Sequence, residues 1–182
     1  MTLSKLALRA ALIAVLIAAG TLLYEGRKYH ASTVTTSPAR TGREMVMVFL
    51  GSTACAPSKQ PGFNQVVRRI AEQLRAKAYE RGRRLNRIGV ALSGSPEEGS
   101  EFLADFGPFE ETVTGRGWLN SAAIKFIWRD LPGTSAVPQL LVLDRDITVS
   151  PRGIAISPDS LIIRIVGVDR IRSWSLAGAP LD

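Results

Sequence analysis

The side chain best suited to covalent chemistry is Cys55, because it is the only cysteine among 182 residues. It stands in the segment 54–58 (Ala-Cys-Ala-Pro-Ser), after the apolar run 45–50 and before an amphipathic stretch. A thiol between a strand and a helix N-terminus lies at the positive end of the helix dipole, which favours the thiolate. One thiol can attack a disulfide but cannot resolve the mixed disulfide that forms. The sequence therefore permits one-thiol chemistry and excludes a self-contained dithiol cycle.

Several other kinds of site lack their components. An internal disulfide needs a second cysteine, and Cys55 and His30 are the only Cys or His candidates for zinc. With a single histidine far from the cysteine, no Ser/His/Asp set can be assembled, and no glycine-rich phosphate loop is present. We therefore expect no metal and no small-molecule cofactor.

The elements that position Cys55 follow from the hydrophobic pattern. The continuous apolar run 45–50 is typical of a strand covered on both faces. The stretch after the cysteine predicts a helix that ends near Gly82. Its apolar stripe consists of Phe63, Val66, Val67, Ile70 and Leu74.

The rest of the chain alternates strands and helices. A capping box at 95–98 (Ser-Pro-Glu-Glu) predicts a helix that runs to about residue 106. The alternation calls for an α/β fold with a mixed sheet flanked by helices. The expected strands are 86–92, 111–114, 139–143 and 161–166, the further helices are 119–129 and 168–174, and 144–160 is expected to be irregular. The tryptophans Trp118, Trp128 and Trp174 are expected in the core or at its rim.

The segment 1–24 is predicted to be one N-terminal transmembrane helix. Residues 6–24 are apolar apart from Arg9, Gly and Ser/Thr, which is long enough to span a bilayer. The alternative is a cleaved signal peptide, with small residues at 18–20 as a possible cleavage site. A small-residue face would allow close packing against helices of other membrane subunits. That face consists of Ala7, Ala11, Ala14 and Ala18.

A linker is predicted over 25–43, followed by a globular domain over 44–182. Basic residues stand on both sides of the apolar segment, so the positive-inside rule barely orients it. We favour a single-pass protein whose domain lies outside the cytoplasm, in a periplasmic or other extracytoplasmic space.

Charge is unevenly distributed along a chain of net charge +7. The stretch 59–87 is strongly basic, whereas 88–111 is acidic and holds no basic residue. The basic stretch could meet anionic lipid or an acidic partner, or it could be a solvated helix face. Nucleic acid is not an expected partner, because the stretch has few aromatic residues and no reader motif.

The motif around Cys55 and the Val137-Pro138 pair before the strand 139–143 together resemble the thioredoxin superfamily. In that family two cysteines stand three positions apart after a tryptophan, and here Ser58 replaces the second cysteine. Phe49 stands where the family has a buried acid. The resemblance implies that Pro138 is cis and lies against Cys55, with the Val137 backbone available to pair with an extended partner segment.

Two functions remain open at this stage. In the first, the domain has no dithiol activity and is a docking subunit of a larger membrane assembly, such as an electron-transfer or biogenesis complex. In the second, Cys55 exchanges disulfides of extracytoplasmic partners as a single thiol, with Ser58 donating a hydrogen bond to the thiolate. Cys55 itself is either an inert, small buried side chain or a reactive thiol.

Overall fold

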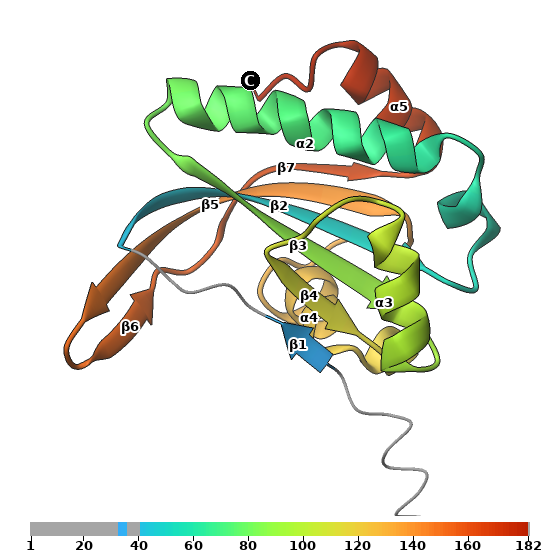
Figure 1. Ribbon diagram of the computed structural model, residues 1–182, viewed down its shortest axis with the longest axis horizontal. Coiled ribbons are helices and arrows are strands. Elements are labelled where there is room, and N and C mark those ends of the chain that lie inside the picture. Colours follow the sequence, from blue (N-terminus) through green and yellow to red (C-terminus); the bar gives the residue numbers. More distant parts are fainter. Residues whose placement is uncertain (1–32, 36–40, 182) are drawn as a thin grey trace, which may run out of the picture.

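The computed structural model describes residues 33–35 and 41–181, and a mixed sheet forms its centre (Figure 1). Within this part of the chain the sheet has seven strands. They are β1 (Thr33–Thr35), β2 (Gly42–Ser52), β3 (Arg84–Leu92), β4 (Glu111–Thr114), β5 (Gln139–Ser150), β6 (Gly153–Ile156) and β7 (Ser160–Val166).

The order and direction of the strands are those of a thioredoxin-like fold. β2, β3 and β4 run parallel, with β2 next to β3 and β3 next to β4. β5 lies antiparallel on the other side of β2, and β7 lies antiparallel to β5. The predicted mixed sheet flanked by helices is therefore confirmed. β1 adds an antiparallel strand beside β4, and β6 pairs with the second half of β5.

Helices cover both faces of the sheet (Figure 1). One face packs against α2 (Phe63–Glu80), α3 (Pro96–Ala104) and α5 (Val168–Leu176). The other face packs against the single turn α4 (Ser121–Ala123) and the π-helical segment η3 (Ile124–Arg129). Two 3-10 turns complete the helical elements of the described residues: η1 (Ala56–Lys59) and η2 (Gly117–Leu119).

The apolar run in β2 is explained by this double cover. Met45, Met47 and Phe49 point into the core under α2, whereas the alternate residues point into the core under α4 and η3. All six residues of the run are fully buried. Because successive side chains of a strand point to opposite faces, a strand covered on both sides must be apolar throughout.

The expectation that 144–160 is irregular is wrong. β5 continues to Ser150 and turns into β6, so that the two strands form a hairpin. Cross-strand apolar pairs stabilise it, namely Ile147 with Ile156 and Val149 with Ile154. The polar residues at the start of this stretch resemble a turn in the sequence, but Arg145 is buried against carboxylates on neighbouring strands.

The predicted membrane segment and most of the predicted linker lie outside the described residues. β1 and the start of β2 occupy part of the range 25–43. No helix within 33–35 and 41–181 is both long enough and apolar enough to cross a bilayer.

Candidate functional site: a single thiol beside a cis proline

Cys55 lies against the loop that precedes β5. The Val137–Pro138 peptide bond is cis, as the sequence resemblance implied. The Cys55 thiol is partly exposed, and its Sγ donates a hydrogen bond to the carbonyl oxygen of Val137 over 3.4 Å. The structure therefore brings together the two predicted parts of the site, which are 82 positions apart in the chain.

The pairing of β2 with β5 brings Cys55 and Val137 together. Leu50, near the end of β2, pairs with Gln139 at the start of antiparallel β5, so the loop after β2 and the loop before β5 leave the sheet side by side. β3 and β4 run parallel to β2 and end at the same edge, at Leu92 and Thr114. We call this edge the thiol end of the sheet.

The helix that follows Cys55 is not the long amphipathic helix. Cys55 precedes only the four-residue 3-10 turn η1, and α2 begins at Phe63. Between them Gln60 is extended, because the residue before a proline, here Pro61, is restricted away from helical geometry. Gly62 follows with a φ of +73°. The expectation that the dipole of this helix acts directly on the thiol is therefore wrong.

Ser58 is built into the loop as a structural residue. It is 1% exposed, and its Oγ accepts a hydrogen bond from the backbone N–H of Ser52 over 3.3 Å. The Ser52 hydroxyl in turn donates to the carbonyl of Leu92 and accepts from the N–H of Ala54. These bonds fix the end of β2 to the Cys55 loop. The suggested bond from Ser58 to a Cys55 thiolate stays a prediction.

Phe49 occupies the centre of an aromatic cluster beneath the thiol end. Its ring centroid lies 4.5 Å from that of Phe106, and Phe63, Phe102 and Phe109 surround it at 6.2 to 6.5 Å. A carboxylate in this position would be desolvated without a partner, at a cost of several kcal/mol. The Phe109 ring packs closely against β3 at Gly89. A Cβ added at Gly89 would lie 2.7 Å from this ring, so a larger residue there would displace it.

Arg164 on β7 holds the loop that leads to the cis proline. Its guanidinium donates to the side-chain oxygen of Gln139 over 2.9 Å and to the carbonyls of Phe126 and Leu131 over 2.9 and 2.6 Å. Gln139 continues the chain of bonds by donating to the carbonyls of Ala136 and Thr134. Burial lowers the pKa of Arg164. We did not predict this contact, although a lone arginine inside the apolar strand 161–166 was a visible signal.

Two of the three tryptophans lie at the rim of the structure. The Trp118 and Trp128 rings are 5.7 Å apart, and the two residues are 42% and 44% exposed. The Trp128 indole N–H donates to Ser135 Oγ over 2.9 Å, in the loop before Val137. Trp174 lies on α5 and is buried in the core instead. The expectation of core or rim positions is confirmed.

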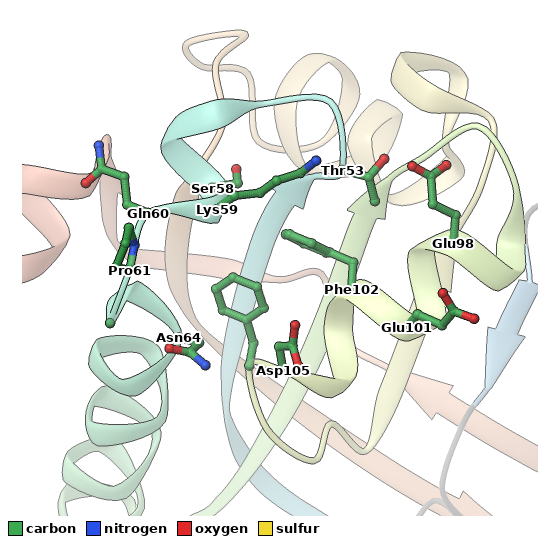
Figure 2. Close-up of a pocket in the computed structure, with 12 residues that line it drawn as sticks. Thr53, Ser58, Lys59, Gln60, Pro61, Asn64, Glu98, Glu101, Phe102 and Asp105 are labelled. Carbon is green, nitrogen blue, oxygen red and sulfur yellow. The ribbon is translucent and has the colours of Figure 1, made fainter.

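A pocket of about 580 Å³ opens beside the Cys55 loop, between η1, α2 and α3 (Figure 2). In Figure 2 the Lys59 side chain reaches across its mouth toward Thr53 and Glu98. A hydrogen bond from Thr53 is the largest cause that lowers the pKa of Glu98, and the Gly94 N–H and the Lys59 charge add to it. Glu98 also completes the predicted capping box, because its N–H donates to Ser95 Oγ. Cys55 does not line this pocket.

The opposite end of the sheet, which we call the charged end, holds a buried ionic network. Arg145 on β5 is 7% exposed and lies 3.1 Å from Glu44 on β2 and 2.9 Å from Glu111 on β4. Arg84 on β3 contacts the other oxygen of Glu44 at 3.1 Å, and Asn86 donates to Glu111. Burial alone would lower the pKa of Arg145, but the bonds and charges of Glu111 and Glu44 raise it. The network joins four strands.

Residues 33–35 and 41–181 contain no group of three or more His, Cys, Asp or Glu side chains placed to hold an ion. His30 lies outside this part.

The chain has a thioredoxin-like fold. Comparison with known proteins found no matching family model and no matching curated protein. Among solved structures it is similar to yeast Sco1, with a TM-score of 0.39 and 14% identity over 74% of this chain and 82% of that chain. It is also similar to apo Sco1 from Thermus thermophilus, with a TM-score of 0.42 and 16% identity over 84% and 89%. A third structure is BsSco, a member of the Sco family of cytochrome c oxidase assembly proteins, with a TM-score of 0.32 and 14% identity over 76% and 82%.

Proposed function

We propose that this chain is a membrane-anchored, thioredoxin-like domain without dithiol redox activity, and that it is a structural docking subunit of a larger membrane protein assembly. Electron-transfer and biogenesis complexes are the candidate hosts. The observation that carries the proposal is the composition of the thiol end. Cys55 contacts the loop of cis-Pro138, but Ser58 is a buried structural hydroxyl and Phe49 lies in an aromatic cluster.

The chemistry of disulfide exchange explains why this composition favours docking. A first thiolate attacks a disulfide, and a second thiol of the same protein must then attack the mixed disulfide to release the product. Ser58 supplies an oxygen that forms no S–S bond, and its place is fixed by the Ser52 N–H. A site of this kind can hold an extended partner segment beside Val137 but cannot turn over by itself.

A docking surface is available on the β5–β6 hairpin, which projects from the charged end of the sheet (Figure 1). Val149 and Ile154 form a cross-strand pair on one face and are 42% and 57% exposed, and Ile156 on the same face is 54% exposed. Successive exposed apolar side chains on one face of a hairpin are typical of a protein interface. We assign this face to contact with a neighbouring subunit.

The basis for the membrane anchor in this proposal is the amino-acid sequence. Residues 6–24 are apolar over a length that spans a bilayer, and the face formed by Ala7, Ala11, Ala14 and Ala18 would pack against a helix of another subunit. We place the domain on the extracytoplasmic side.

Co-purification of the full chain from its own membranes in a mild detergent tests the docking role. We expect defined subunits in constant ratio to the chain, and we expect the double variant Ile154→Asp/Ile156→Asp to lose them. Tyr79→Asp is the matched control, because Tyr79 is 84% exposed and belongs to α2, not to the hairpin. A chain that is always recovered alone, or partners that both variants retain equally, would contradict the proposal.

The absence of a dithiol cycle is tested separately. With a protein disulfide as substrate and no added thiol, we expect the reduced wild-type chain to stop at the mixed disulfide with Cys55 and to release no reduced substrate. Release of reduced substrate without an added thiol would refute this half of the proposal even if the docking partners were found.

One observation favours a second function, which is monothiol exchange: the Cys55 sulfur is partly exposed beside the Val137 backbone. In this reaction the Cys55 thiolate attacks one sulfur of a partner disulfide, forms a mixed disulfide and releases the other sulfur as a thiolate. A first external thiolate then attacks the Cys55 sulfur of the mixed disulfide and releases the partner with both of its thiols reduced. A second external thiolate attacks the new mixed disulfide on Cys55, so that Cys55 is regenerated and the two external thiols leave as their disulfide.

Alkylation of Cys55 as a function of pH tests this second function. An apparent pKa well below about 8.5, the value of a free thiol, would support it. Trapping of mixed disulfides from membranes, with Cys55→Ser as the control, would identify the partners. A rate profile of an ordinary thiol together with no trapped partner would exclude it.

A further inference from the structure

An exposed apolar patch lies beside the loop that carries the cis proline. It consists of Trp118 and Leu119 on η2 and of Ile124 and Trp128 on η3, and we call it the aromatic rim. The exposed fractions are 42%, 66%, 36% and 44% in that order. The contact between the two indole rings and the bond from Trp128 to Ser135 connect the rim to the loop before Val137.

The described chain enters the domain at the same end as the aromatic rim. β1 runs antiparallel to β4, with Thr33 opposite Thr114. Thr114 is the last residue of β4, and η2 with Trp118 begins three positions later at Gly117. Thr33, the first described residue, therefore lies at the thiol end of the sheet, not at the charged end.

The length of the chain that precedes β1 sets a limit on how far the rim can be from a membrane. Eight residues, 25–32, separate the end of the apolar segment at Tyr24 from Thr33. A fully extended chain covers at most about 3.3–3.6 Å per residue, so the nine steps from Tyr24 to Thr33 reach no more than about 32 Å. If the apolar segment spans the bilayer, the thiol end stays near the membrane surface.

We propose that the aromatic rim rests on the lipid bilayer and inserts its tryptophan and leucine side chains into the headgroup layer. The proposal depends on the anchor assigned under the proposed function. Indole rings favour this layer because one part of the ring is apolar and its N–H remains polar. Exposed Arg116 adjoins the rim in sequence and supplies a cation for lipid phosphates, whereas Arg129 is paired with Asp130 at 2.6 Å.

A lipid surface fits the rim better than a protein subunit does. The tether brings this end of the domain to the bilayer, whereas the apolar hairpin at the charged end points away from it and stays open to soluble parts of other subunits. Docking would place Cys55 and Val137 close to the headgroups. The segment that this site holds would then come from the membrane-proximal part of its partner.

Tryptophan quenching in lipid nanodiscs tests the proposal on the full chain. The discs contain the chain and lipids brominated near the carbonyl end of the acyl chain, so quenching reports contact with lipid and not with another protein. Trp174 is a reference, because it is buried on the other face of the sheet. We expect Trp174→Phe, which keeps both rim tryptophans, to be quenched at least twofold more than Trp118→Phe/Trp128→Phe, which keeps only Trp174.

A pair of surface variants tests the same point without altering any tryptophan. Leu119→Asp places a charge in the rim and is expected to reduce the quenching at least twofold, whereas Leu176→Asp is expected to leave it unchanged. Leu176 is a matched control, because it is 77% exposed at the end of α5. Equal quenching in these two variants, or in the two tryptophan variants, would overturn the docking of the rim.

The same samples separate this proposal from the anchor. A chain that floats with the discs and resists extraction at high pH, but shows no quenching of the rim tryptophans, contradicts the rim proposal alone. A chain that does not associate with the discs contradicts both the anchor and the rim proposal.

Discussion

Two arginines, the buried Arg145 at one end of the sheet and the partly buried Arg164 at the other, are held in opposite ways. Arg145 at the charged end binds the carboxylates of Glu44 and Glu111, and its pKa is raised. Arg164 binds the side-chain amide of Gln139 and two backbone carbonyls, and among its described hydrogen-bond partners there is no carboxylate. Its pKa is lowered by burial.

The difference shows how each end obtains its order. At the charged end, buried side chains of opposite charge on four strands stabilise one another. The geometry of this end is therefore set by the strands themselves. The thiol end is ordered by hydrogen bonds to uncharged groups: those of Ser52 and Ser58 fix the Cys55 loop, and those of the Arg164 guanidinium hold η3, Leu131 and Gln139. The geometry of this end therefore depends on the Cys55 loop and the loop before Val137 staying in place.

The largest effect is expected from Arg145→Met. This change leaves Glu44 buried and without its main cation, which should lower the free energy of unfolding by about 3–5 kcal/mol. Chemical denaturation of the full chain in detergent measures it. Arg43→Met is the control, because the Arg43 side chain is 61% exposed and its pairs with Asp144 and Asp146 are worth at most about 1 kcal/mol. Equal effects would mean that the network does not carry the stability of this end.

Arg164→Met should have a smaller effect on stability and a distinct effect on the thiol. Loss of the bonds to Gln139 and to the carbonyls of Phe126 and Leu131 should cost about 2–3 kcal/mol. The loop before Val137 should loosen, so the alkylation of Cys55 should accelerate. Arg164→Lys should not restore the slow rate, because an ammonium cannot reproduce the planar array of donors. Arg145→Met should leave the alkylation rate of Cys55 unchanged. The two variants are compared at denaturant concentrations equally far below their own unfolding midpoints.

The stability of the charged end should also depend on pH. Glu110 accepts bonds from the backbone N–H and the side chain of Arg87. Burial opposes ionisation of Glu110, but these bonds and the Arg87 charge lower its pKa below the ordinary value. A lowered folded pKa stabilises the protein above the ordinary pKa, and this contribution is lost as the pH falls through the folded pKa.

Glu110→Gln should therefore destabilise the chain by about 1 kcal/mol near neutral pH. The difference in free energy of unfolding between Glu110→Gln and the wild type should become smaller as the pH falls below the ordinary glutamate pKa of about 4.3. Urea denaturation over a pH series measures this difference. A difference that stays constant with pH would show that the carboxylate charge does not contribute.

The smallest change in stability, but a clear chemical change, is expected from Ser58→Cys. The bond from the Ser58 N–H to the Cys55 carbonyl closes a turn, which keeps the two Cα atoms within about 7 Å. Mild oxidation should then form an intramolecular disulfide, so that the count of free thiols falls from two to zero. If both thiols stay reactive, the backbone of the thiol end does not allow a disulfide between positions 55 and 58. The site would then differ from a dithiol site in its geometry as well as in the missing second cysteine.

Much of the fold was predictable from the sequence, because it depends on local patterns. The apolar run in β2, the stripe of α2, and the Ser95 cap with Pro96 each determine an element through the periodicity or capping chemistry of neighbouring residues. The contact between Cys55 and Val137 was accessible only through the resemblance to the thioredoxin superfamily. Residues 82 positions apart leave no local signal.

Other parts depend on contacts that a sequence does not display. Asp144, Arg145 and Asp146 have the composition of a turn, and the carboxylates of Glu44 on β2 and Glu111 on β4 allow Arg145 to lie inside a sheet. The break between η1 and α2 has a local signal in Pro61, but the distance that it puts between Cys55 and the start of α2 has none. The role of Arg164 depends on Gly133 as well, where a Cβ would lie 2.5 Å from the guanidinium.

The outer side of β5 is divided between two partners: β7 follows its first half as far as Asp144, and β6 follows its second half from Ile147. The sheet therefore does not present one long unpaired border there but two short ones, of seven and four residues. A second molecule that added a strand could form only a few backbone bonds before the border ended. We expect the domain to resist amyloid-like stacking at high concentration, so that any stable oligomer is built through side chains.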